Sequence, residues 1–287
     1  MEKGSPNDTF KEVEHSLKTK GISFFDCPFS DETLSKWNKL LDPQFAKMGN
    51  GYRTEVSIAK LYELGIFNEF FNPTMRSFIR SLMPDANLLT FHCYENAGNQ
   101  SFTIKTRDNN VEWHRDVSDL VGLNNDDLNY LSIFFYLTNV GEKSGAFEIR
   151  PLSPNVPLQN SDDSLRVVGT VGKSFVWNRT FFHRQSINES PQRRRVLKLS
   201  IQHNYLENDS ILTKDFKEVF NKIDPQETFL RYMTGEQYEL SHRGKLLPNV
   251  DYLPLKSSED ITTNSKVIIS SLTHLFRKIR AKIRKMI

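Results

Sequence analysis

Hydrophobic residues recur at helical spacing through the first part of the chain. Residues 9–20 form one such stretch, and SDET at positions 30–33 is typical of the N-terminal cap of a second helix, which we expect to reach Leu41. Residues 66–82 have apolar positions at mixed steps of three and four and predict a further helix. Residues 1–84 are therefore expected to be a helical part that packs on a core.

The pattern changes after Pro84 to short segments rich in β-branched and aromatic residues. Strands are predicted at 88–94, 130–137, 146–150, 174–177 and 196–203. Turn-like sequences separate them, which is typical of a jelly-roll. We predict a mainly β core with flanking helices, a double-stranded β-helix of the jelly-roll or cupin-like type, over residues 85–205. Helical spacing returns at 212–239, so a helical C-terminal part is expected over 206–255.

The composition fits a soluble globular protein with one substantial core, since 38% of the 287 residues are hydrophobic and 25% are charged. Cys27 and Cys93, the two cysteines, have no C-x-x-C spacing, so we expect no disulfide framework and a reducing compartment. The first ten residues lack the apolar core of a secretion signal, and no apolar run is long enough to span a bilayer. A cytoplasmic location is therefore expected.

The end of the chain differs from the rest in charge. Residues 264–287 include seven basic side chains and no acidic one, and subtracting these from the net charge of +3 leaves −4. A mildly acidic body does not suit a nucleic-acid partner. We expect a linker and a basic amphipathic helix over 256–287. The apolar stripe within 267–287 indicates either peripheral contact with the inner membrane surface or packing on protein.

The segment VEWHRD at positions 111–116 is the most informative one for chemistry. Side chains of an extended chain alternate between two faces, so His114 and Asp116 would point to the same side. A second imidazole would complete a 2-His-1-carboxylate set, which leaves open positions on iron(II). His183, directly after a strand-like run, is the best candidate for it. We therefore predict His114, Asp116 and His183 as the metal ligands and catalytic residues.

A basic triplet at 193–195 follows the predicted third ligand. Arg194 lies eleven residues after His183, and a planar guanidinium can bind a carboxylate through two parallel hydrogen bonds. Whether Arg193 or Arg194 faces the metal depends on where the following strand begins, and the sequence leaves this open.

These segments together resemble the phytanoyl-CoA dioxygenase family of iron(II)/2-oxoglutarate-dependent oxygenases. The resemblance covers about residues 88–205 and rests on three pieces of sequence. They are WHRD at 113–116, the strand and turn LSIFFYLTNV at 131–140 followed by SGAFEIRP at 144–151, and His183 with Asn188, Ser190 and Arg194 after it. The resemblance implies that the triad binds Fe(II), that 2-oxoglutarate and O2 are co-substrates, and that Arg194 binds the distal carboxylate of 2-oxoglutarate.

Two further cofactor contacts are implied at positions where the chain departs from the family. Phe134 stands where the family often has Trp. A serine usually follows the distal histidine by two places; Gln185 is found there, and Ser186 comes next. The family's P-G-S-H run is replaced by PLSP at 151–154. Phe134 and Ser186 are thus predicted to contact the co-substrate.

The implied reaction hydroxylates an unactivated C–H bond and forms succinate and CO2. The prime substrate would be a small molecule, a lipid-linked molecule or a glycan. Related halogenases replace the carboxylate ligand with a small residue, so Asp116 favours hydroxylation over halogenation. Desaturation, ring formation and epimerisation use the same triad and stay open.

Two alternatives accompany this interpretation. The alternative function is a catalytically silent jelly-roll binding protein, tethered to a membrane or a partner by its C-terminal helix. The loop at 117–129, which contains Gly122, Asn124 and Asn125, is either a lid over the metal or a solvated connector. A histidine in an apolar strand, His92, is expected either in the core or facing the pocket.

Overall fold

The computed structural model describes residues 6–48, 53–100, 112–116, 128–151, 163–203 and 213–235. The chain divides into two compact units, residues 1–242 and 243–287, and every described residue belongs to the first. The predicted linker and tail helix at 256–287 lie outside the described residues. So does the predicted loop at 117–129, apart from Leu128 and Asn129. No helix in the described ranges is long and apolar enough to cross a membrane.

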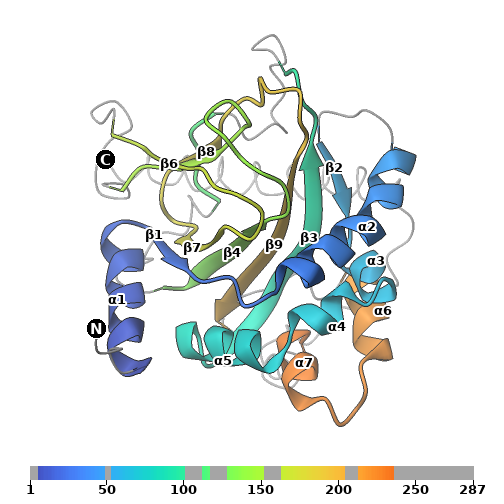
Figure 1. The fold of residues 1–287 in the computed structure, drawn as a ribbon. Coiled ribbons are helices and arrows are strands. Elements are labelled where there is room, and N and C mark those ends of the chain that lie inside the picture. Colours follow the sequence, from blue (N-terminus) through green and yellow to red (C-terminus); the bar gives the residue numbers. More distant parts are fainter. Residues whose placement is uncertain are drawn as a thin grey trace, which may run out of the picture. The chain divides into compact units, whose positions relative to one another are not determined.

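A six-stranded antiparallel sheet forms the centre of the first unit (Figure 1). In spatial order its strands are β1 (Ile22–Phe25), β7 (Ser174–Asn178), β4 (Tyr130–Tyr136), β9 (Arg194–His203), β3 (Ala86–Asn96) and β2 (Arg53–Val56). A smaller sheet has the order β6 (Leu165–Val167), β5 (Phe147–Ile149) and β8 (His183–Gln185). Apolar residues of the two sheets pack against each other, which is the two-sheet arrangement of a jelly-roll.

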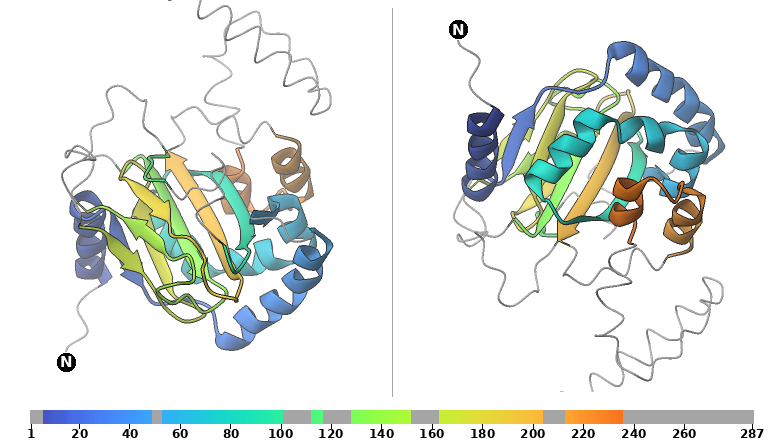
Figure 2. Two further views of the ribbon diagram at one scale, coloured as in Figure 1. Left: turned by 90° about the horizontal axis from the view of Figure 1, so that it is seen from above. Right: turned by 90° about the horizontal axis from the view of Figure 1, so that it is seen from below.

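Helices pack on the other face of the main sheet (Figure 2). They are α1 (Pro6–Thr19), α2 (Asp31–Met48), α3 (Ile58–Glu63), α4 (Ile66–Phe70), α5 (Pro73–Leu82), α6 (Lys214–Lys222) and α7 (Thr228–Met233). Their buried apolar side chains form one core with that face, and full burial of each large side chain contributes roughly 1.5–3 kcal/mol. The chain before Pro84 thus supplies five of these helices, α1 to α5, and also the edge strands β1 and β2.

Successive side chains of β9 point alternately toward the core under the helices and toward the space between the two sheets. Leu197, Leu199 and Ile201 belong to the core with the helices. Arg194 and Lys198, on the opposite side of the strand, line a pocket instead. The inner face of β9 thus combines an apolar residue of the core between the sheets, Val196, with these two cationic side chains.

The predicted strands are all present, and their ends differ from the expected ones by at most two residues. The single helix expected at 66–82 is wrong, because α4 ends at Phe70 and α5 begins at Pro73. Asn72 caps α5, since its side-chain oxygen accepts a hydrogen bond from the Met75 amide at 2.9 Å, and proline is favoured in a first turn. The stretch 212–239 likewise contains two helices, α6 and α7.

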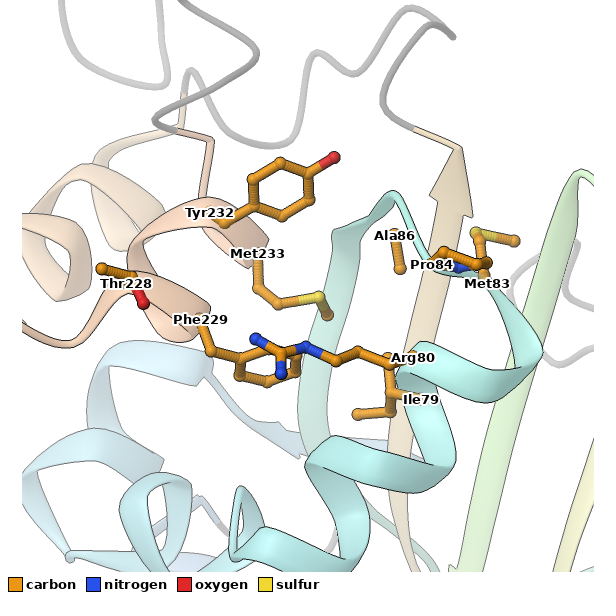
Figure 3. Close-up of a pocket in the computed structure, with 9 residues that line it drawn as sticks. All are labelled: Ile79, Arg80, Met83, Pro84, Ala86, Thr228, Phe229, Tyr232 and Met233. Carbon is orange, nitrogen blue, oxygen red and sulfur yellow. The ribbon is translucent and has the colours of Figure 1, made fainter. Parts of the chain in front are cut away.

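A cavity of about 320 Å³ lies in the helical layer (Figure 3). It is lined mainly by α5 and α7, with Ile79, Phe229 and Met233 among its walls. The Arg80 guanidinium lies over the Phe229 ring, 4.9 Å from the ring centre. This cavity shares no residue with the pocket of the predicted metal ligands, so the two are separate features of the fold.

Candidate metal centre

The three predicted ligands come together beside the smaller sheet. His114 and His183 form an isolated antiparallel bridge, with backbone N–O distances of 3.0 Å and 2.9 Å. This bridge joins the segment 112–116 to the start of β8. Ligand atoms of His114, Asp116 and His183 all lie within 4.8 Å of one another. The structure therefore brings a carboxylate and two imidazoles to one point, as their spacing in the sequence predicts.

Backbone carbonyl groups fix the orientation of both imidazoles. His114 Nδ1 lies 2.8 Å from the carbonyl oxygen of Glu112, and His183 Nδ1 lies 3.0 Å from that of Phe181. A carbonyl oxygen only accepts, so Nδ1 carries the proton in each ring and Nε2 offers its lone pair to a metal. The His183 ring is buried against Trp177, and burial lowers its pKa. The neutral form of His183, which a metal requires, is thereby favoured.

Asp116 presents one carboxylate oxygen to the histidines and the other to two cations. Oδ1 lies 3.7 Å from His114 Nε2 and 3.5 Å from His183 Nε2. Oδ2 accepts a hydrogen bond from Arg179 Nε at 2.8 Å, and Lys198 Nζ lies 3.9 Å from it. Burial alone would raise the pKa of Asp116, but the charges of Arg179 and Lys198 hold it well below its ordinary value. Asp116 is therefore ionised, as a metal ligand must be.

The donor set suits a first-row divalent metal. Two imidazole nitrogens and one carboxylate oxygen are the ligands of non-haem iron(II) sites with open positions, so these residues fit the predicted metal. The pocket around them is small, about 30 Å³. A space of this volume holds a water-sized group. The other lining residues are Arg53, Tyr94, Phe134, Phe147, Trp177, Arg184, Gln185, Arg194 and Lys198.

Arg194 reaches this pocket from the start of β9. Its side chain is 1% exposed; one amino group donates to the Tyr94 hydroxyl at 2.7 Å, and the other donates to the Gly145 carbonyl. Its Nε has no hydrogen-bond partner within the described ranges. Arg193 pairs with Glu95 instead, at 2.8 Å. Of the two arginines that the sequence left open, Arg194 is the one that lines the pocket.

The structure brings one of the two other predicted cofactor contacts to the pocket. Phe134 lines it and is 4% exposed. Ser186 does not line it, because its hydroxyl donates to Glu148 at 2.6 Å. Gln185 lies in the pocket instead, since residues two apart on a strand share a face and His183 is two places before it. The sequence therefore predicted Ser186 at the position where Gln185 lines the pocket.

Arg179 and Lys198 were not predicted from the sequence. Arg179 follows β7 and is far from Asp116 along the chain, so no local spacing indicates the contact between them. Lys198 could have been predicted to line the pocket, because it lies four places after Arg194 on the same strand and so shares its face. Both side chains contact the carboxylate through the oxygen that faces away from the histidines.

Comparison with solved structures shows the fold. SnoN, a non-haem α-ketoglutarate-dependent epimerase from nogalamycin biosynthesis, matches with a TM-score of 0.54 and 12% identity over 69% of this chain and 84% of its own. HygX from Streptomyces hygroscopicus, solved with nickel and 2-oxoglutarate bound, matches with a TM-score of 0.54 and 12% identity over 69% and 88%. EvdMO1 matches with a TM-score of 0.54 and 15% identity over 68% of this chain, which spans only 50% of EvdMO1.

These similarities define a class of fold. The core is the jelly-roll that non-haem, 2-oxoglutarate-dependent enzymes share, which confirms the predicted fold class. At such low identities the match speaks to the fold alone. No family model matches the sequence, and no curated protein matches it either. Membership of the phytanoyl-CoA dioxygenase family therefore stays a prediction.

Proposed function

We propose that the protein is a non-haem iron(II), 2-oxoglutarate-dependent oxygenase. The observation that carries this proposal is the meeting of His114, Asp116 and His183 in one pocket with a buried arginine. Two proteins of similar fold support it. SnoN is an α-ketoglutarate-dependent epimerase, and HygX binds nickel and 2-oxoglutarate. In this proposal the triad binds iron(II) and Arg194 binds the distal carboxylate of 2-oxoglutarate.

The protein's own residues have distinct tasks in this reaction. When bound, iron(II) with 2-oxoglutarate and O2 supplies an oxidant that can remove a hydrogen atom from an unactivated C–H bond, with succinate and CO2 as co-products. Arg194 offers a fork of donors to a carboxylate, and its unpartnered Nε is a further donor. Phe134 and Phe147 form apolar walls that keep water from the co-substrate.

The proposed outcome is hydroxylation of a small-molecule, lipid-linked or glycan substrate. Asp116 would supply the carboxylate ligand that halogenases lack, which supports hydroxylation over halogenation. SnoN is an epimerase, so a jelly-roll of this kind also serves other outcomes, and the substrate decides among them. A screen of candidate substrates is the way to assign the outcome.

Anaerobic binding of iron(II) and 2-oxoglutarate tests the proposal without knowledge of the substrate. Chelation of iron(II) by a 2-oxo acid produces a visible charge-transfer absorption, which reports metal and co-substrate together. We expect this band in the native protein and in the control variant His15→Ala, whose histidine is exposed on α1. We expect none in His114→Ala. A native protein without the band, or a His114→Ala variant that keeps it, would refute the proposal.

A further inference from the structure

The walls of the metal pocket carry several positive charges. Its cationic lining residues are Arg53, Arg184, Arg194 and Lys198, and Asp116 is the acidic one. Arg53 is paired with Glu55 at 2.5 Å, and Arg184 with Glu148 at 2.6 Å. These two arginines therefore have carboxylates of their own. Arg194 has the distal carboxylate of 2-oxoglutarate in the proposed function, which leaves Lys198 to be explained.

Lys198 has no carboxylate of its own in the described part of the chain. Its nearest acidic atom, Asp116 Oδ2, lies 3.9 Å away and already accepts a hydrogen bond from Arg179 at 2.8 Å. The Lys198 side chain is only 16% exposed. An ammonium group that is largely withdrawn from water and poorly paired is costly, so its place beside the metal indicates a function rather than a contribution to stability.

Binding of the metal and 2-oxoglutarate does not remove this positive charge. Asp116 and one carboxylate of the co-substrate balance the two charges of iron(II), and the other carboxylate balances Arg194. Arg179 and Lys198 would then keep one positive charge each, both beside the Asp116 carboxylate. A substrate with a negative group would neutralise them, whereas a neutral substrate would leave both charges buried.

Two neutral hydrogen-bonding groups lie beside Lys198 on the inner face of the main sheet. His92 on β3 is paired in register with Lys198 on β9, and Thr90 is paired with Ser200, one step further along. His92 Nε2 and Thr90 Oγ1 are buried without a hydrogen-bond partner in the ranges that the structure describes. Burial and the surrounding cations hold the pKa of His92 well below its ordinary value, so its ring is neutral and can donate one hydrogen bond.

We propose that the prime substrate carries an oxyanion, a carboxylate or a phosphate, which Lys198 binds next to the metal with His92 and Thr90 as hydrogen-bonding neighbours. This inference rests on the proposed function and narrows its substrate class. Residues paired across antiparallel strands have β-carbons about 4.5–5.5 Å apart, so the side chains of His92 and Lys198 can reach one anionic group together. In this proposal His92 faces the substrate, which is one of the two alternatives that the sequence left open for it.

Calorimetric titration with small anions tests this assignment. The native protein is loaded with Mn²⁺ and 2-oxoglutarate without oxygen, which blocks turnover, and is titrated with inorganic phosphate, acetate or uncharged acetamide at constant ionic strength. We expect phosphate or acetate to bind and acetamide not to bind, and the tighter anion identifies the kind of oxyanion. Lys198→Met, which keeps the length of the side chain, should weaken anion binding about tenfold or more.

Control variants separate this result from general effects of charge or folding. Lys47→Met removes one positive charge from an exposed position on α2 and should bind anions as the native protein does. Lys198→Gln keeps a polar tip and should lose anion affinity like Lys198→Met, so the test survives if one variant fails to fold.

Two outcomes would overturn the assignment, and neither can be confused with failure of the proposed function. One is anion binding that both Lys198 variants retain. The other is a loss of 2-oxoglutarate affinity in these variants, which would make Lys198 part of the co-substrate site. Failure of the proposed function shows earlier, because the native protein would then bind no Mn²⁺ and 2-oxoglutarate before any anion is added.

Discussion

Asp116 is held so that its two oxygens have different surroundings. Arg179 binds Oδ2 at 2.8 Å, which turns Oδ1 toward both histidines. A carboxylate ligand that loses such a partner can rotate, and removal of partners of this kind lowers metal affinity about 10- to 100-fold. Arg179 is thus a positioning residue for the metal.

Arg179→Met should therefore weaken Mn²⁺ binding by about 10- to 100-fold, because the Asp116 carboxylate loses its orientation. Equilibrium titration with a competing chelator measures this affinity. Arg80→Met, at an exposed position of α5, is the control and should bind Mn²⁺ like the native protein. Equal affinities in Arg179→Met and the control would show that Asp116 needs no such partner.

Arg194→Met should lower the affinity for 2-oxoglutarate and leave metal binding unchanged. Hydrogen bonds to a charged group contribute about 1.5–3 kcal/mol, which corresponds to a loss of about 10- to 100-fold. Arg193→Met is the matched control, since Arg193 pairs with Glu95 and does not line the pocket. Titration of the metal-loaded protein with 2-oxoglutarate distinguishes the two. A larger effect from Arg193→Met would reverse the assignment.

The proximity of His114 and Asp116 could be predicted because their spacing is local, whereas His183 was a candidate only through its place after a strand-like run. His114 and Asp116 are two residues apart, and an extended chain places such residues on one side. Arg179 escaped prediction because its contact with Asp116 depends on which strands lie side by side. The choice between Arg193 and Arg194 needed the first residue of β9, and strand ends are set by pairing with neighbours rather than by composition.

At the scale of elements, Glu148 holds the smaller sheet together. It lies in the middle of β5 and is completely buried, and it accepts hydrogen bonds from Arg166 at 2.7 Å and from Arg184 and Ser186, each at 2.6 Å. These contacts connect β5 to β6 and to β8, the strand that begins with the ligand His183. Burial alone would raise the pKa of Glu148, but Ser186 and the two arginines lower it.

Glu148→Gln should destabilise the protein by about 2 kcal/mol at pH 7, because charge-assisted hydrogen bonds are lost. The folded-state pKa of Glu148 is lowered, so its contribution is present above the ordinary carboxyl pKa and is lost as the pH falls through the folded value. The difference in unfolding free energy between native and variant, measured by urea denaturation, should therefore stay constant from pH 7 to about pH 5 and shrink as the pH falls below about 4.5. A difference that stays constant over the whole pH range would contradict this role.

The longer strands were predictable, and most of the shortest ones were not, although the three-residue β5 was predicted within 146–150. β3, β4 and β9 are long enough to show their character in the sequence. β1, β2, β6 and β8 have three or four residues each, and they are strands only because a neighbouring strand pairs with them. The helix expected at 66–82 is split because Asn72 caps a new helix. Asn72 was overlooked because the apolar residues on both sides of it keep helical spacing.

At the scale of the whole molecule, the chain before Pro84 is part of the core. It supplies β1 and β2 to the main sheet and α2 to α5 to the core on its outer face. A chain that starts at residue 85 would expose that face and leave β7 and β3 as unpaired edges. We therefore expect the N-terminal part predicted at 1–84 to be required for folding of the β core.

A chain starting at residue 85 should show no cooperative thermal unfolding by circular dichroism. A chain ending at residue 242, which keeps the first compact unit, is the control and should unfold cooperatively near the temperature of the full chain. Cooperative unfolding of the shorter core would mean that β1, β2 and the helices are dispensable. The predicted membrane contact of 267–287 lies outside the described residues and stays a prediction.

Formation of succinate from 2-oxoglutarate tests the proposed function most directly. Enzymes of this kind turn over 2-oxoglutarate slowly without their prime substrate, so the iron-loaded protein exposed to oxygen is enough. We predict iron-dependent succinate from the native protein and from His15→Ala, and none from His114→Ala, which lacks one metal ligand. No succinate from the native protein, or equal amounts from His114→Ala, would contradict the assignment and favour a jelly-roll that binds without turnover.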